Sequence, residues 1–346
     1  MKLVRTLVLL GIIVFVGIFP VGIAPNDAVN TIAVFALIGA IAVVGWNLFS
    51  GYTGYISLGH SVFYGFGAYT FGLVSRGWRI PGGWEPFLLL PLTGLVTGVV
   101  ALPLGWVALR TRRHTFVVIT IAFVFIFQLL AYNLRGITNG SNGVFMPLTP
   151  WEAPYADLPF YYVAFGVLLV AIGISWWIRH SKFGLGLLAI RDDEDRALGL
   201  GVPTEGFKLT AYVVSAVFVG IAGAIFAYYV GAIYPEGAFN PAFDITIALM
   251  AFLGGLGTVV GPLLGALVVT PLQQYLDLQF GGNGINLVIY GALFLAIILL
   301  LPRGVVPSLQ EQWRRWQAAR KTQLGGNVPT TRPEQPARFA ERGGEG

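Results

Sequence analysis

Residues 47–70 read NLFSGYTGYISLGHSVFYGFGAYT, and this stretch decides the fold class. It lies between long apolar segments, yet it contains five glycines, three serines, an asparagine and a histidine. Backbone that faces lipid cannot leave its hydrogen bonds unmade, so irregular polar backbone at membrane depth lines a path enclosed by protein. The stretch therefore points to transport across a membrane.

The composition of the whole chain is that of a membrane protein. Of its 346 residues, 56% are hydrophobic and 11% are charged, and the mean hydropathy is +0.75; charged residues make up about 25% of soluble domains. The net charge of +5 comes from basic residues scattered in short loops, which favours a lipid bilayer over a nucleic acid as the partner. Because the chain has no cysteine, disulfides and cysteine-ligated metals are excluded.

The apolar runs predict an all-α polytopic membrane protein with about eight to ten transmembrane helices, some of them broken by glycines. Residues 6–24 resemble a secretory signal, but no small-x-small cleavage site follows, so we expect an uncleaved first span. The glycines of 254–257 interrupt residues 245–276, which would form two short crossings or a re-entrant hairpin. The expected spans are 6–24, 31–49, 56–74, 87–109, 115–133, 160–178, 209–229, 245–257, 258–276 and 285–301.

The placement of lysine and arginine predicts that both termini are cytoplasmic. With the N-terminus inside, all of the 21 basic residues except Arg76, Arg79 and Arg135 fall on the cytoplasmic side, as the positive-inside rule requires. The opposite orientation would reverse that ratio.

Two regions follow from this topology. We expect residues 1–305 to form a transmembrane permease domain, with a cytoplasmic loop at 179–208. Residues 306–346 would form a cytoplasmic tail. From residue 323 the tail is rich in glycine, proline, glutamine and charges and lacks apolar periodicity, so we expect it to be disordered there.

Several enzyme motifs are missing. The chain contains no Gly-Lys pair and therefore no Walker-type ATP site, no H-E-x-x-H metal motif and no G-x-S-x-G elbow. We expect no metal or cofactor bound by this chain, and ATP would be used by partner subunits. The acidic run of residues 191–196, RDDEDR, leaves a Mg-dependent membrane prenyltransferase as a remote alternative, although the second aspartate cluster that such an enzyme needs is absent.

The same acidic run lies in a candidate docking segment. Residues 183–200, FGLGLLAIRDDEDRALGL, carry apolar side chains at near-helical spacing with charges between them. A short amphipathic helix there would either present one face to a cytoplasmic partner or pack on the end of the helix bundle. The candidate contact residues are Leu187, Ala189, Ile190, Arg191, Glu194, Arg196, Ala197, Leu198 and Gly199.

Polar residues and glycines in or beside the apolar spans are the candidates for a substrate path. An unpartnered polar group is costly in apolar surroundings, so each polar residue pairs with a neighbouring helix or faces the path. Glycine permits φ > 0 or a close approach of helices. The candidates are Asn47, Gly51, Gly54, Ser57, His60, Gln128 and Asn133.

Four motifs, in chain order, resemble those of LivM-type permeases, the inner-membrane subunits of ABC importers for branched-chain amino acids. Residues 51–70 are similar to the family's glycine-rich motif, and residues 138–143, TNGSNG, to its T-G-G-S-[ND]-G element. Residues 181–201 resemble the family's cytoplasmic loop, and residues 254–265, GGLGTVVGPLLG, its late glycine motif. Asn139 stands where a glycine is usual.

The resemblance implies a division of labour. A periplasmic binding protein would deliver leucine, isoleucine or valine. A second, homologous permease would complete the path, and two cytoplasmic ABC ATPase subunits would dock beneath it. The chain would then be a multi-pass, non-enzymatic subunit in a bacterial inner membrane.

Two alternatives remain among transporters. An importer of urea or short-chain amides has similar permeases. An ion-coupled secondary transporter would usually need buried ionisable residues, and the expected spans contain almost none besides His60. Asp244, in particular, is expected to be isolated and to lie outside the spans.

Overall fold

The computed structural model describes residues 16–20, 27–152, 155–280, 285, 288–289, 291–292 and 295–296. All of them belong to the first of two units, Met1–Val306. The expected spans 6–24 and 285–301 lie largely outside the described residues. The tail of 306–346 lies wholly outside them.

The described part consists mainly of α-helices. They are α2 (Asp27–Trp46), α3 (His60–Gly77), α4 (Leu90–Ala108), α5 (Arg113–Asn133), α6 (Arg135–Thr138), α7 (Leu158–His180), α8 (Lys182–Asp192), α9 (Glu194–Gly199), α10 (Thr204–Val230), α11 (Pro235–Ala238), α12 (Pro241–Gly254) and α13 (Gly261–Phe280). The shorter elements are the π-helix η1 (Asn47–Gly51), the 3-10 helices η2 (Glu85–Leu89) and η3 (Gly140–Asn142), and the antiparallel strands β1 (Val144–Phe145) and β2 (Ala232–Ile233).

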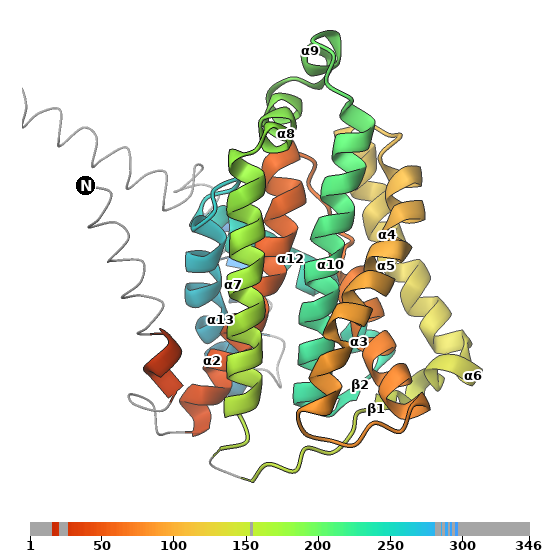
Figure 1. The fold of residues 1–346 in the computed structure, drawn as a ribbon, viewed down its shortest axis with the longest axis vertical. Helices are drawn as coiled ribbons and strands as arrows, with labels where there is room; N and C mark the ends of the chain where they lie inside the picture. Colours follow the sequence, from red (N-terminus) through yellow and green to blue (C-terminus); the bar gives the residue numbers. More distant parts are fainter. Residues whose placement is uncertain are drawn as a thin grey trace, which may run out of the picture. The chain divides into compact units, whose positions relative to one another are not determined.

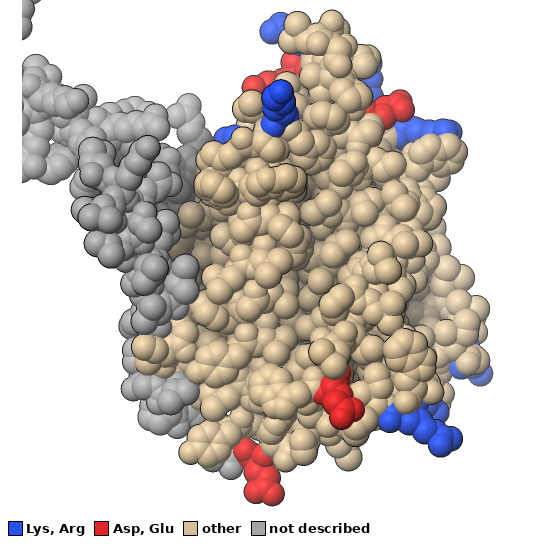
Figure 2. Space-filling view, viewed as in Figure 1, with Lys and Arg blue, Asp and Glu red and all other residues tan. Residues whose placement is uncertain are grey.

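The described helices identify an all-α polytopic membrane protein. Six of them are long and apolar enough to cross a bilayer. Charged side chains gather at the two ends of the described part, with a nearly uncharged band between them (Figure 2). The six spans are Val29–Gly51, Glu85–Ala108, Arg113–Asn133, Leu158–His180, Thr204–Val230 and Pro235–Gly254.

Helix α10 organises the packing, because α2, α3 and α4 all lie against it. In Figure 1, α8 and α9 lie at one end of the helices and β1 and β2 at the other. The backbones of α3 and α10 touch where Gly67 meets Gly220: a side chain on Gly67 would overlap the carbonyl oxygen of Gly220. Small residues at a membrane-helix crossing permit this approach.

Helix α3 begins at His60, whereas the apolar run predicted a span from residue 56. Residues 54–59 belong to no helix, and Gly54 turns the chain with a φ of +73°. The carboxyl group of Asp244 on α12 accepts hydrogen bonds from the backbone N–H of His60, at 2.7 Å, and of Ser61, at 3.2 Å. A side chain from another helix therefore caps α3, which no local pattern predicts.

The late glycine segment separates two helices. Helix α12 ends at Gly254 and α13 begins at Gly261, and the two pack against each other. The turn between them needs glycine, since Gly255 and Gly257 have φ of +121° and +77°. Helix α12 begins at Pro241, four residues before the expected span, and this places Asp244 inside the bundle.

Candidate functional site

A buried polar cluster lies where α3 begins. Ser61 Oγ donates to Asp244 Oδ2 at 2.6 Å. The ring of His60 lies between two hydroxyls, with Nδ1 2.9 Å from Ser57 Oγ and Nε2 2.6 Å from Ser215 Oγ on α10. All five of these side chains are fully buried. The cluster thus joins α3, α10 and α12 at the end of the non-helical segment 54–59.

The prediction that Asp244 lies outside the spans is wrong. Its carboxyl group is fully buried and accepts three different donors from the start of α3. The sequence does contain a signal: within residues 239–253, FNPAFDITIALMAFL, Asp244 is the only charged residue. A lone acidic residue in an apolar run is a candidate for a functional site.

Asn47 ties the end of α2 to the turn between α12 and α13. Its side-chain oxygen accepts from the N–H of Gly257 at 2.8 Å, and its Nδ2 donates to the carbonyl of Thr258 at 2.9 Å. A side chain on Gly51 would overlap the Asn47 oxygen. These contacts join two glycine-rich segments that lie about 200 residues apart in the chain.

The remaining path candidates divide into two groups. The backbone carbonyl of Ser57 accepts a hydrogen bond from the indole N–H of Trp46, at 2.8 Å, and Ser57 lies in the same segment as His60. Gln128 on α5 instead donates to the carbonyl of Phe239, at 3.1 Å. Asn133 is exposed and bonds to its own helix. The structure therefore gathers Asn47, Gly51, Gly54, Ser57 and His60 along one segment and leaves Gln128 and Asn133 apart from it.

Helix α8 is hydrogen-bonded directly to residues 47–60, which we call the glycine segment. Arg191 Nη1 donates to the carbonyl of Gly51 at 2.9 Å. Arg113 Nη2 donates to the carbonyls of Ile190 and Arg191, both at 2.8 Å. Arg113 thereby provides a hydrogen-bond donor for carbonyl groups in the last turn of α8. At Gly54 a Cβ atom would lie 3.1 Å from Arg191 Cγ. Any side chain at Gly54 would thus meet both a strained φ and Arg191.

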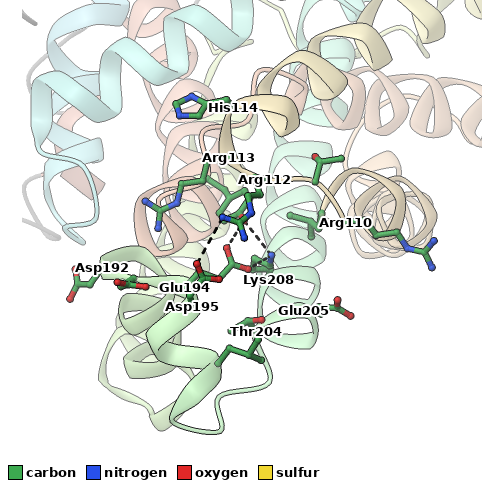
Figure 3. A pocket seen from close by; sticks show the side chains of 15 residues that line it. Arg110, Arg112, Arg113, His114, Asp192, Glu194, Asp195, Thr204, Glu205 and Lys208 are labelled. Carbon is green, nitrogen blue, oxygen red and sulfur yellow. Dashed lines mark hydrogen bonds and ion pairs between the residues drawn. The ribbon is translucent and has the colours of Figure 1, made fainter.

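A second link joins α9 to the same segment, beside a cavity of about 510 Å³. Glu194 accepts from Lys208 Nζ and from the Tyr55 hydroxyl, both at 2.5 Å. Figure 3 shows Glu194 and Lys208 converging near Arg112 and Arg113, while Arg110 points away from them. Lys208 and Tyr55 are buried, and Glu194 is partly buried.

The surroundings of Glu194 favour its charged form. Burial alone would raise the pKa of its carboxyl group, but the hydrogen bonds from Lys208 and Tyr55 and the charges of Lys208 and Arg113 outweigh burial. The pKa of Glu194 therefore lies below its ordinary value of 4.5. A carboxylate stabilised in this way adds to folding stability above pH 4.5, and this contribution is lost as the pH falls through the lowered pKa.

Glu194→Gln should therefore lower the unfolding temperature of the purified protein at pH 7, and the difference from wild type should shrink below about pH 4.5. Glutamine is uncharged at every pH. Wild type loses the same charge when Glu194 is protonated in acid, so the two proteins become alike there. Thermal unfolding followed over a pH series measures the effect. Glu205→Gln, at an exposed residue of the same cavity, is the control. A wild-type advantage that grows on acidification would contradict this account.

The candidate docking residues are placed differently from one another. Leu187, Ile190 and Ala197 are buried against the chain's own helices, so the expectation that a partner buries them needs correction. Their apolar spacing predicted one helix over 183–200, where the structure has α8 and α9 separated at Asp193, and it did not show which face turns inward. Ala189, Arg191 and Glu194 are partly buried, whereas Arg196, Leu198 and Gly199 are exposed.

Two aspartates of the acidic run already contact other residues of this chain. Asp193 Oδ1 accepts from the backbone N–H of Arg196 at 3.0 Å and so caps α9. Asp195 lies 3.9 Å from Arg112 in an exposed pair. Within the described ranges, no three His, Asp or Glu side chains are grouped so as to hold a metal ion.

The comparisons with known proteins agree with one another. The chain is 29% identical over 308 residues to the high-affinity branched-chain amino acid transport system permease protein LivM of Salmonella typhimurium, a match that covers 81% of this chain and 70% of that protein. It is 28% identical to LivM of Escherichia coli (84% and 72% covered) and 24% identical to the permease protein LivH of that organism (77% and 90% covered). No solved structure gives a significant match. Residues 28–298 match the family described as branched-chain amino acid transport system, permease component, and the chain belongs to this family.

Proposed function

We propose that this chain is the permease subunit of an ATP-binding cassette importer for branched-chain amino acids. A periplasmic binding protein delivers leucine, isoleucine or valine, and a second, related permease completes the path. Two ATPase subunits supply the energy, and the chain itself has no catalytic site. Family membership supports this class, as do the LivM and LivH names of the relatives.

The observation that carries the mechanism is the attachment of α8 and α9 to the glycine segment. We place the α8–α9 end in the cytoplasm of a bacterial inner membrane, because basic residues concentrate on that side. Arg191 bonds to Gly51, and Glu194 bonds to Tyr55. A displacement of α8 and α9 by an ATPase would therefore pull directly on residues 51–55.

We propose that exposed leucines on α8, on α9 and directly after α9 together contact the ATPase. We define this docking patch as Leu185, Leu198 and Leu200, which are 60%, 60% and 84% exposed. Solvent-exposed leucines in this number suit a protein partner. Apolar contact would contribute most of the binding, since exposed pairs such as Arg196 with Asp193 are typically worth less than about 1 kcal/mol.

Replacing Leu198 and Leu200 with aspartate should prevent the ATPase subunits from co-purifying with the permease pair. Each aspartate would have to be desolvated in an apolar contact, which is costly. Leu148→Asp, at a leucine that is 91% exposed near the β1 end, is the matched control. ATPase recovery equal to that of the control would show that docking uses another surface.

Uptake into proteoliposomes tests the proposed function itself. The complete complex, with its binding protein, should accumulate radiolabelled leucine only when ATP is supplied. Accumulation of urea or acetamide in place of leucine would support the alternative importer. Leucine uptake by the chain in the absence of ATPases would overturn the proposal.

A further inference from the structure

A second cavity, of about 240 Å³, lies between α2, α12 and α13. One side of it is aromatic and apolar. The ring centroids of Tyr64 and Phe243 lie 4.3 Å apart, and that of Phe226 lies 5.5 Å from Tyr64. Ile247 and Met250 extend this surface along α12. The cavity is separate from the cleft that Glu194 lines.

The other side of the cavity is polar but uncharged. Among the residues that the structure describes, none that lines the cavity is ionised at neutral pH. Asn240 already uses its side-chain oxygen to accept from the N–H of Ala242, at 2.9 Å, so its amide nitrogen is the group it can offer to a ligand. The polar lining residues are Asn240, Thr246, Thr270, Gln273 and Gln274.

Thr270 provides an independent sign of a ligand. It is 5% exposed, and its hydroxyl has no hydrogen-bond partner in the part of the chain that the structure describes. Several threonines in other helices of this protein donate to a carbonyl three or four residues earlier, as Thr93 does to Leu90 and Thr97 to Thr93. The Thr270 hydroxyl lies instead against Gly39 of α2, at the edge of the cavity. Buried hydroxyls are rarely left unpaired, because their desolvation costs free energy.

We infer that this cavity is a transit site for the transported amino acid, in which Thr270 bonds to the zwitterion and the aromatic side receives its aliphatic side chain. The inference rests on the proposed function. The volume is slightly below the roughly 300–1,000 Å³ of pockets for drug-sized ligands, as a single amino acid requires. A lipid tail would leave the polar side unpaired, and urea would leave the aromatic side uncovered.

The uncharged lining also sets the selectivity and the strength of binding. A zwitterion with an apolar side chain carries no net charge, whereas lysine or glutamate would bring an unpaired charge to a lining without a counter-ion. Dipoles of hydroxyl and amide groups hold a zwitterion weakly. Weak binding suits transit, because a site on a path must also release what it binds.

Thr270→Val tests the site without disturbing the fold. Valine keeps the shape of threonine, and the lost hydroxyl has no partner in the described chain, so the unfolding temperature should not fall. ATP-driven leucine uptake by the complete complex should nevertheless decrease roughly fivefold at low leucine, the usual cost of one hydrogen bond to a ligand. Thr97→Val, which removes a buried hydroxyl outside the cavity, should leave uptake unchanged.

Thr246→Trp tests the site by filling it. Thr246 lines the cavity and is partly buried, so a tryptophan at this position would occupy space within the cavity. Leucine uptake should fall at least tenfold, while Ile245→Trp, at a half-exposed neighbour outside the lining, should have little effect.

The outcomes separate the inference from the proposed function. If the wild-type complex does not import leucine, the proposed function fails. If the wild type imports leucine and both cavity variants match their controls, the transit site is refuted and the function stands. Should Thr246→Trp fail to assemble, Thr270→Val decides alone: uptake equal to that of Thr97→Val refutes the site.

Discussion

Asp244→Ala should abolish leucine import by the reconstituted complex. Alanine removes the acceptor for the N–H groups of His60 and Ser61 and for the Ser61 hydroxyl, all of which are buried. Each buried donor left without an acceptor costs about 1–3 kcal/mol, and no water is available at membrane depth to replace the acceptor. We therefore expect α3 to lose its starting point and the cluster around His60 to rearrange.

Asp244→Asn separates the hydrogen bonds from the charge. An asparagine oxygen can still accept from the two N–H groups, and the Ser61 hydroxyl can turn to accept from the asparagine nitrogen. This variant should keep its unfolding temperature close to that of wild type. Glu236→Ala, at an exposed acidic residue on α11, is the control. An Asp244→Ala protein that melts and transports like this control would show that the cap on α3 is dispensable.

The Asp244 cap also shows where sequence reasoning reaches its limit. Apolar length predicted five of the six membrane-spanning helices to within five residues at each end, because a helix that crosses a bilayer must be long and apolar whatever its neighbours are. The start of α3 could not be predicted in this way. It depends on a carboxyl group 184 residues later in the chain, and such a contact leaves no periodic pattern.

The docking segment shows the same limit. The spacing of Leu187, Ile190 and Leu198 predicted one helix, whereas the structure has two, α8 and α9. The spacing also did not distinguish the face that packs on the bundle from the face that meets a partner. Leu187 and Ile190 lie inside, and Leu198 lies outside. The hydrogen bonds of Arg191 and Glu194 to the glycine segment could not be predicted either, because a charged residue in an acidic run is usually interpreted as solvated. The family resemblance predicted the class of function, whereas the hydrogen bonds of Arg191 and Glu194 became known only from the fold.

Removing both connections, with Arg191→Ala and Glu194→Ala in one chain, should uncouple ATP hydrolysis from import. The docking patch stays intact in this variant, so the ATPase subunits should still co-purify and hydrolyse ATP. The bonds from Arg191 to Gly51 and from Glu194 to Tyr55 would be absent. Coupling between sites is typically worth 5- to 150-fold, and we expect leucine import per ATP hydrolysed to fall roughly tenfold or more.

The single variants and a control within the same loop make this test specific. Each single variant leaves one connection in place and should retain more import than the double variant, by more than an additive effect allows. Arg196→Ala removes only an exposed pair with Asp193 and should import normally. If the double variant instead loses the ATPase, as the docking-patch variant does, then Arg191 and Glu194 shape the docking surface. In that case they do not transmit its movement, because transmission requires that docking and hydrolysis survive while import is lost.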